Sequence, residues 1–266
     1  MNTPRPYRPT PMITGALAVH AGAVAALAVS PATWPWAAAG VVASHAALTA
    51  AGLWPRSTLL GHNWLTLPES AERSIAITID DGPDPEVTPR MLDLLDRHAA
   101  RATFFCIGER VQRHPEIVEQ IIARGHAVEN HSQRHRHHFS LSGPGALRRE
   151  IEVAQNTIGE IVGVTPRFFR APAGLRNPFL EPVLCALGLQ LASWTRRGFD
   201  TRERNAKVIA DRLTRGLAAR DILLLHDGHP ARDATGEPVS LEALDIVLRK
   251  IADEGLRCVT LREVIT

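Results

Sequence analysis

The chain divides into two parts that differ in how hydrophobic and polar residues follow one another. Between Arg8 and Arg56 no Lys, Arg, Asp or Glu occurs, and Ala, Val and Leu dominate. From Ser74 onward, short apolar runs alternate with longer segments of helical period. That alternation is typical of repeated βα units around a parallel sheet.

The expected elements of the second part can be placed from these runs. The expected strands cover residues 75–79, 102–107, 126–129, 167–169, 190–194, 222–225 and 258–261. The expected helices cover residues 86–98, 115–124, 144–162, 178–187, 204–219 and 240–254. Seven strands with six intervening helices predict an α/β barrel that falls short of eight units rather than an open sheet.

The uncharged first part has the composition of a membrane anchor. Two apolar runs, 12–29 and 34–54, are separated by Ser-Pro-Ala-Thr. At about 1.5 Å per residue, runs of 18 to 21 residues reach roughly 27 to 32 Å, against a hydrocarbon core of about 30 Å. Tryptophans at 34, 36 and 54 flank the second run, as expected for residues at a membrane interface. We therefore expect a hydrophobic helical hairpin in a bacterial-type inner membrane, with both ends and the catalytic domain on the cytoplasmic side.

Two alternatives remain for this part. The first run has the length of a secretory signal that is cleaved near Ala-Val-Ser, which would leave the second run as a single anchor. The other alternative is a buried, Ala-rich helical pair of a soluble protein, although no polar residue recurs there with helical period. The sequence thus predicts an anchor over 1–56, a polar linker over 57–73 and one catalytic domain over 74–266.

Composition excludes some classes of function. The net charge is only +2, and the Lys and Arg residues form no basic stripe with interleaved aromatics, so nucleic acid is not expected as a partner. Neither GxGxxG nor GxxxxGK[ST] occurs, which removes the usual signatures of nucleotide binding. The three cysteines are odd in number and lack CxxC spacing, which favours reduced thiols. The oligomeric state is left open.

Acidic and imidazole side chains follow the expected strands. Asp80 and Asp81 end the first strand side by side, and two adjacent carboxylates remain ionised together only near a cation. His131 and His135 are spaced i and i+4, on one helical face or one turn, which suits a pair of imidazole ligands. A site of two His and one carboxylate binds divalent metals. We take Asp81 as the third ligand and Asp80 as a general base for a water whose pKa the metal lowers from about 16 toward 7.

Three further residues complete this hypothesis. His226 closes the sixth expected strand and is placed to protonate a leaving amine. Arg170 follows the fourth strand and can keep the base ionised through a bidentate contact. Asp200 is placed to orient either His226 or Arg170. The neighbouring His137 and His138 could substitute as ligands but are expected to be solvated or to line the groove. A structural role is expected for His98, His114 and His126, the phenylalanines, Asp84, Asp227 and Cys106.

These segments resemble the motifs of the polysaccharide deacetylase family, the NodB-homology domain of carbohydrate esterase family 4. The similarity covers about three quarters of the chain, from residue 74 to residue 266. Residues 78–83 resemble T-F-D-D-G-P with Ile in place of Phe, and residues 131–135 match H-[ST]-x-x-H. Residues 170–174 resemble R-x-P-Y-G, and residues 223–227 fit the last motif. The resemblance implies a distorted (β/α)7 barrel, a base at Asp80, ligands at Asp81, His131 and His135, a catalytic acid at His226, and an Arg170 that steadies the base.

The resemblance also implies substrate contacts, and here the sequence departs from the family. Pro172 and the amide of Ala173 would form the oxyanion turn, and Leu225 or Leu224 would line an acetyl pocket. Ala173 replaces the usual Tyr, so that one groove wall is lost while the backbone donor remains. Residues 194–200 resemble the family's fourth motif only at its second acid, Asp200. Arg197 stands where the first acid is usual, and Thr201 stands where a Trp is usual.

Taken together, the sequence predicts a metal-dependent hydrolase that removes an N-acetyl or other N-acyl group from amino sugars of a polysaccharide or a lipid-linked saccharide. The expected cofactor is Zn²⁺, with Co²⁺ or Ni²⁺ compatible with the same ligands. The expected partners are an N-acylated glycan or glycolipid and membrane lipid. Two alternatives are a deacylase or deformylase of a small N-acyl compound or glycolipid, and a membrane-tethered glycan-binding pseudoenzyme.

Overall fold

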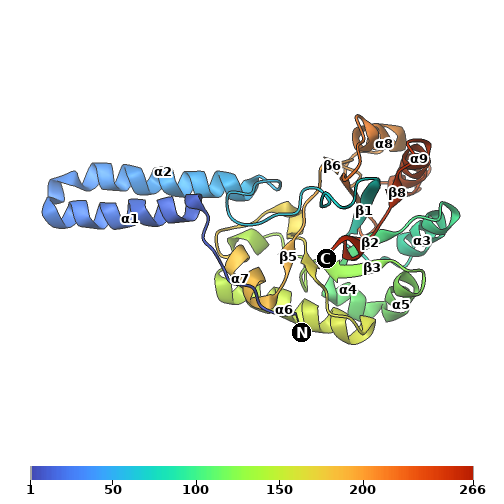
Figure 1. The fold of residues 1–266 in the computed structure, drawn as a ribbon, viewed down its shortest axis with the longest axis horizontal. Coiled ribbons are helices and arrows are strands. Elements are labelled where there is room, and N and C mark those ends of the chain that lie inside the picture. The colour runs from blue at the N-terminus through green and yellow to red at the C-terminus, as the bar shows by residue number, and fades with distance from the viewer. Residues whose placement is uncertain (1, 266) are drawn as a thin grey trace.

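A computed structural model of the protein describes residues 2–265, in which a long helical hairpin projects from an α/β domain (Figure 1). The hairpin consists of α1 (Pro11–Val29), a short 3₁₀ turn (Pro31–Thr33) and α2 (Trp34–Leu53). Thr10 caps α1 by accepting a hydrogen bond from the Ile13 amide. Both helices are long and apolar enough to cross a membrane, as the sequence predicts. One histidine of each helix meets the other between them, because His20 Nε2 lies 3.1 Å from His45 Nε2.

The domain is built on a parallel sheet of eight strands in the order β5-β4-β3-β2-β1-β7-β6, with β8 paired to β1. The strands are β1 (Ser74–Asp80), β2 (Ala102–Cys106), β3 (Ala127–Asn130), β4 (Phe168–Phe169), β5 (Gln190–Leu191), β6 (Arg196–Arg197), β7 (Ile222–His226) and β8 (Arg257–Cys258). All seven expected strands are present, and β6 is an additional two-residue strand. The result is a parallel half-barrel, which confirms the predicted distorted barrel.

Helices cover the convex side of this sheet. They are α3 (Val87–Arg97), α4 (Gly108–Arg113), α5 (Pro115–Ala123), α6 (Pro144–Val162), α7 (Leu180–Leu187), α8 (Ala206–Thr214) and α9 (Val239–Asp253). Helix α6 has the predicted bounds because Pro144 starts it and Gly163, in the left-handed conformation, ends it. Helix α8 starts two residues later and ends five residues earlier than predicted; Arg215 is already extended and Gly216 has a positive φ of 64°.

Alternation along β1 separates two hydrophobic cores. Ile75, Ile77 and Ile79 face the helices and belong to a large cluster with α3, α8 and α9. Ala76 faces the other side and joins the cluster inside the half-barrel, which also contains Phe105, Phe168 and Leu224. Successive side chains of a strand point to opposite faces, so Thr78 and Asp80 also face the inside of the half-barrel.

Residues 57–73 run across the open side of the half-barrel. Trp64 forms a bridge with Ala192 beyond β5, and Thr66 forms one with Asp221 just before β7. Leu67 is completely buried in the inner cluster. This segment therefore connects the two flanks of the sheet that strand pairing leaves apart.

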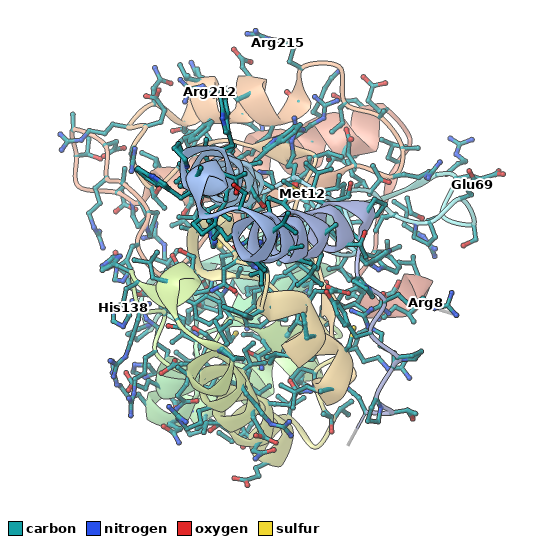
Figure 2. The ribbon with its side chains drawn as sticks, turned by 90° about the vertical axis from the view of Figure 1, so that its left-hand side faces the viewer. Arg8, Met12, Glu69, His138, Arg212 and Arg215 are labelled. Atoms are coloured by element: carbon teal, nitrogen blue, oxygen red, sulfur yellow. The ribbon has the colours of Figure 1, made fainter. Side chains whose placement is uncertain are left out.

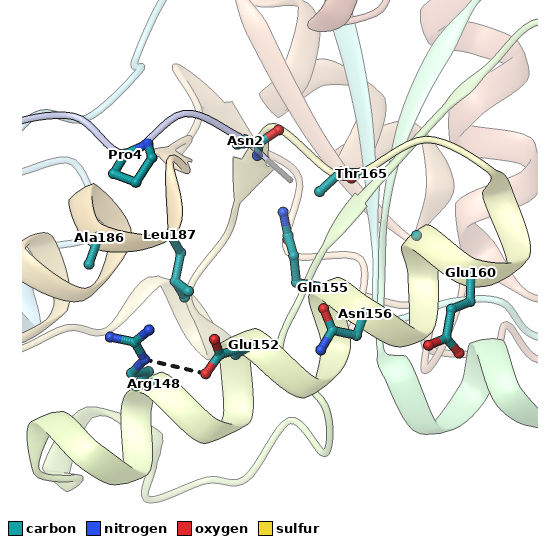
Figure 3. Close-up of a pocket in the computed structure, with 11 residues that line it drawn as sticks. Asn2, Pro4, Arg148, Glu152, Gln155, Asn156, Glu160, Thr165, Ala186 and Leu187 are labelled. Carbon is teal, nitrogen blue, oxygen red and sulfur yellow. Dashed lines mark hydrogen bonds and ion pairs between the residues drawn. The ribbon is translucent and has the colours of Figure 1, made fainter.

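Residues 2–10 also pack against the domain. Arg5 forms an ion pair of 2.9 Å with Glu181 on α7, and its amide donates to the Cys185 carbonyl. Thr10 Oγ1 donates to the Leu59 carbonyl at 2.6 Å. Figure 3 shows the start of the chain, with Asn2 above α6, at a pocket of about 550 Å³ that contains none of the predicted site residues. At the other end of the hairpin, the Arg176 amide donates to the Gly52 carbonyl in α2, so both ends of the hairpin are fixed to the same domain.

Candidate active site

The adjacent carboxylates lie at the carboxyl end of β1 but point in different directions. Asp80 is the last residue of β1 and is buried inside the half-barrel. Asp81 follows with a φ of 77°, a left-handed conformation that Asp tolerates better than most residues, and its amide donates to the Phe105 carbonyl. This turn separates the two side chains, so that each can have its own role.

The two histidines lie on a loop that follows β3. His131 comes directly after Asn130, the last residue of β3. Ser132 and His135 both have positive φ, and the Ser132 hydroxyl accepts a hydrogen bond of 3.0 Å from the His135 amide. The i, i+4 spacing therefore corresponds to a turn and not to a helical face. The two rings come together with their centroids 4.8 Å apart.

Asp81, His131 and His135 converge on one point. Asp81 Oδ1 lies 3.3 Å from the Nε2 atom of each histidine, and one potential ligand atom from each of the three residues lies within 4.8 Å of the others. Asp81 Oδ1 is buried and accepts no hydrogen bond within residues 2–265. A buried carboxylate oxygen without a partner is costly, and a cation between these atoms would remove that cost.

The protonation of these groups also fits a divalent metal. His131 Nδ1–H donates to the Arg170 carbonyl at 2.8 Å, which leaves Nε2 free to bind a metal. Burial and the neighbouring His131 lower the pKa of His135 to about 4, so that its ring is neutral at pH 7. Burial opposes ionisation of Asp81, but His131 outweighs it and holds the pKa of the carboxyl well below its usual range. Burial lowers the pKa of His131, but Asp80 and Asp81 outweigh burial and raise it, so that a bound metal would take the place of a proton at this ring. Two imidazoles and a carboxylate are a donor set typical of divalent transition metals.

Arg170 holds Asp80 from inside the half-barrel. Its Nη1 donates to Asp80 Oδ1 at 2.7 Å and to Thr78 Oγ1 at 2.7 Å. The predicted bidentate contact is not formed, because Nε and Nη2 donate instead to the carbonyls of Ala192 and Ser193. Asp80 Oδ2 remains free on the side of the metal-ligand cluster, 3.8 Å from His131 Nε2.

His226 lies opposite Asp80 and is held by Asp200. The register of β1 and β7 pairs Asp80 with His226. Asp200 accepts from the His226 amide at 2.7 Å and from its Nδ1 at 2.8 Å, so of the two predicted partners Asp200 orients His226. Burial disfavours the imidazolium, but Asp200, with smaller contributions from Asp81 and Asp80, outweighs burial and raises the pKa of His226 to about 9. The ring is therefore protonated on both nitrogens and positively charged at neutral pH.

The remaining predicted residues divide between the site and the core. Ala173 has a φ of 54° and is exposed at the tip of the Pro172–Gly174 turn, which follows Arg170 after one residue. Pro172 is buried beneath it. Leu225 pairs with Ile79 and packs in the helix-side cluster, so it faces away from the site. Leu224 occupies the inner face of β7 with His226, which makes it the leucine that can approach a substrate.

Asp227 is a buried group that the sequence assigns to a turn. Thr88 Oγ1 donates to its Oδ2 at 2.5 Å, and a Cβ on Gly82 would collide with the carboxylate. Burial, reinforced by Asp81, raises the pKa of Asp227 to about 7. Its position directly after His226 at a strand end is the only sequence signal that could have singled it out. Trp194 and Thr78 were also missed, because neither residue type indicates contact with a buried arginine.

Comparisons with known proteins agree with this geometry. The sequence pattern of the family described as polysaccharide deacetylase matches residues 68–192. A peptidoglycan-N-acetylglucosamine deacetylase of Bacillus cereus is 36% identical over 196 residues, which is 73% of this chain and 89% of that protein. The chain belongs to the polysaccharide deacetylase family. It is thus a hydrolase of carbon–nitrogen bonds other than peptide bonds, with the metal-binding Asp-His-His triad in place.

Other relatives extend the comparison. A chitooligosaccharide deacetylase of Bradyrhizobium is 31% identical, and the match covers 70% of this chain and 88% of that one. The solved structure of the peptidoglycan deacetylase PdaC from Bacillus subtilis is 32% identical, with a TM-score of 0.64 over 73% of this chain and 91% of that chain. A family pseudoenzyme from Bacillus anthracis has the same fold at 22% identity and a TM-score of 0.65, so the fold by itself does not establish activity.

Proposed function

We propose that this protein is a membrane-anchored N-deacetylase that removes acetyl groups from amino sugars of glycans related to peptidoglycan or chitooligosaccharides. The observation that carries the proposal is the convergence of Asp81, His131 and His135 beside a free oxygen of Asp80. Relatives at 36% and 31% identity are a peptidoglycan-N-acetylglucosamine deacetylase and a chitooligosaccharide deacetylase, which supports this substrate class. The filled acid, base and ligand positions argue against a pseudoenzyme.

In this proposal Asp81, His131 and His135 hold a divalent cation, most simply Zn²⁺. When bound, the cation supplies Lewis acidity and lowers the pKa of a coordinated water toward 7. Asp80 accepts the proton of the attacking water at Oδ2, because its other oxygen is occupied by Arg170. Arg170 holds that carboxylate in place through one hydrogen bond and is itself fixed by two backbone carbonyls.

His226 and the turn at Ala173 act on the other side of the scissile amide. The charged ring of His226 can donate its Nε2 proton to the departing amine, because Asp200 holds Nδ1 and fixes the orientation of the ring. In this proposal the amide of Ala173, on its exposed turn, donates a hydrogen bond to the oxyanion, as the family motif implies. Leu224 lies on the same strand face as His226 and is assigned to the acetyl pocket in place of Leu225.

The test is acetate release from N-acetylglucosamine oligomers and peptidoglycan fragments by the full-length protein in detergent or nanodiscs. Activity is expected to disappear on chelation and to return with Zn²⁺. His131→Ala is expected to abolish activity, whereas His137→Ala, which changes an exposed residue on the same loop, is the matched control and should remain active. Activity that survives chelation and the His131 substitution would refute the proposal.

We further propose that residues 1–56 form the membrane anchor, residues 57–73 join it to the domain, and residues 74–266 are the catalytic part, with both ends of the hairpin on the cytoplasmic side. The contacts of residues 5 and 10 with the domain support a first helix that is retained and not cleaved. Fusions of alkaline phosphatase and green fluorescent protein to the carboxyl terminus test the orientation. Fluorescence without phosphatase activity is expected, and phosphatase activity would refute it.

A further inference from the structure

A pocket of about 630 Å³ opens where α2 enters the domain. Its walls come from the end of the hairpin and from the β6–α8 region, and it contains five arginines and no Asp or Glu: Trp54, Pro55, Arg56, Trp194, Thr195, Arg196, Arg197, Phe199, Arg212 and Arg215. Figure 2 looks onto the side of the domain from which the hairpin projects, with Arg212 and Arg215 labelled above the helices. We call this the arginine pocket.

Three of these arginines have no carboxylate partner. Arg196 pairs with Asp221, and Arg212 pairs with Glu203 at 3.2 Å. Over residues 2–265, Arg56, Arg197 and Arg215 form no ion pair. Positive charges gathered without counterions repel one another, so that an anion is the ligand that the arginine pocket favours.

Arg197 is the residue most clearly shaped for a ligand. Its Nε is buried and has no hydrogen-bond partner in the described chain. Its guanidinium stacks over Trp194 at 5.4 Å and over Phe199 at 5.1 Å. These contacts restrict the guanidinium and leave Nε without a partner, as in arginines that recognise phosphate. Sequence comparison alone marks Arg197 only as a replacement of an acid that the family motif usually carries.

The arginine pocket adjoins the catalytic groups. The ring of Trp194 is shared, because Arg170, which holds Asp80, lies with its Cζ 5.7 Å from the Trp194 centroid. Trp194 and Pro55 also cover Gly174 of the oxyanion turn, where an added Cβ would meet both side chains. Trp194 therefore lines the arginine pocket and also contacts both Arg170, which holds the catalytic base, and the oxyanion turn.

The arginine pocket also lies at the expected membrane surface. Trp54 directly follows Leu53, the last residue of α2, and Arg56 comes two residues later. Trp and Arg at this position are typical of the boundary between lipid and water. An anion bound here has its lipid tail, if it carries one, next to the bilayer.

We propose that the arginine pocket binds the phosphate or diphosphate of a lipid-linked N-acyl amino sugar and thereby presents the sugar amide to the metal-ligand cluster. This inference rests on the proposed deacetylase function and names its substrate class. Ala173, which lacks the side chain that forms a groove wall in the family, is exposed next to Gly174, and Pro55 and Trp194 of the arginine pocket lie against Gly174. A free, neutral glycan would leave the three unpaired guanidinium groups without counterions.

The experiment compares two substrates with full-length, Zn²⁺-loaded protein in phosphatidylcholine nanodiscs. One probe is N-acetylglucosamine linked to a prenyl diphosphate, and the other is an uncharged alkyl N-acetylglucosaminide with a tail of equal length. The readout is kcat/KM for acetate release from the prenyl diphosphate probe divided by kcat/KM for the uncharged probe. Removing one charge-assisted hydrogen bond to phosphate in Arg197→Gln or Arg215→Gln is expected to lower this ratio about tenfold, mainly through KM. Arg197→Lys should recover part of the loss, and Arg249→Gln, an exposed arginine on α9, is the matched control.

The outcomes separate this inference from the function on which it rests. A ratio that is the same in Arg197→Gln, Arg215→Gln and Arg249→Gln, or a wild-type preference for the uncharged probe, overturns the substrate class while deacetylation itself stands. No acetate from either probe or from N-acetylglucosamine oligomers overturns the proposed function and this inference with it. Nanodiscs with phosphatidylglycerol provide a further arm. If hydrolysis of the uncharged probe then becomes dependent on Arg197, the ligand is a membrane headgroup, and the lipid-linked substrate is overturned.

Discussion

Replacing Asp200 by Asn is expected to move the alkaline limit of activity. The carboxylate contacts His226 through both oxygens, at 2.7 and 2.8 Å, and is the main reason why the pKa of His226 is raised from its ordinary 6.5 to about 9. A catalytic acid must be protonated, so activity falls as pH rises through this pKa. Without the charge at 200 the pKa returns toward 6.5, and the protonated fraction drops about fourfold at pH 7 and about 77-fold at pH 8.5.

The assay is the pH dependence of kcat/KM for acetate release, measured with parent and Asp200→Asn at the same metal loading. A bound cation itself lowers the pKa of His226, but it acts equally on both proteins, so their difference isolates Asp200. The Asn side chain can still accept one hydrogen bond from His226, so the variant is expected to stay folded. Its melting temperature checks this. An alkaline limb that stays at the same pH in a folded, metal-loaded variant would refute the assignment of His226 as acid and Asp200 as its partner.

Two further predictions concern the base and the N-terminal arm. Asp80→Asn should keep the metal and lose at least about 100-fold in kcat, because the free oxygen can no longer take a proton; full activity would remove Asp80 as the base. Arg5→Gln should lower the free energy of unfolding by about 1–2 kcal/mol, because buried Glu181 loses its counterion. The loss stays below the 3–5 kcal/mol typical of a fully buried pair, because Arg5 is partly exposed. Thermal melting measures this, with the exposed Arg249→Gln as control; an unchanged melting temperature would show that the arm is not docked.

The fold was largely predictable because hydrophobic periodicity is a local property. Residues 144–162 form a helix with the predicted bounds, since Pro144 and Gly163 mark its ends in the sequence. The two-residue strand β6 could not be predicted, because Arg196 and Arg197 carry no strand pattern and pair with β7 only through the tertiary fold. The shortened α8 shows the same limit, since helical period continues past the point where Gly216 turns the chain.

The candidate site was predictable in residue type more than in geometry. Motif spacing identified Asp81, His131 and His135, but their convergence depends on left-handed backbone at positions that the sequence does not mark as unusual. The choice between Leu224 and Leu225 required the β1–β7 register. The arginine pocket could not be seen in the sequence at all, because it joins residue 56 to residues 197 and 215.

The most direct test of the central claim is the metal content and affinity of the purified full-length protein. One divalent ion per chain is expected, measured by mass spectrometry of the metal and by competition with a chelating dye. Asp81→Ala or His131→Ala should weaken binding at least about tenfold, and His137→Ala should not. A protein that binds no divalent ion, or that binds it equally well without Asp81 and His131, would contradict the account.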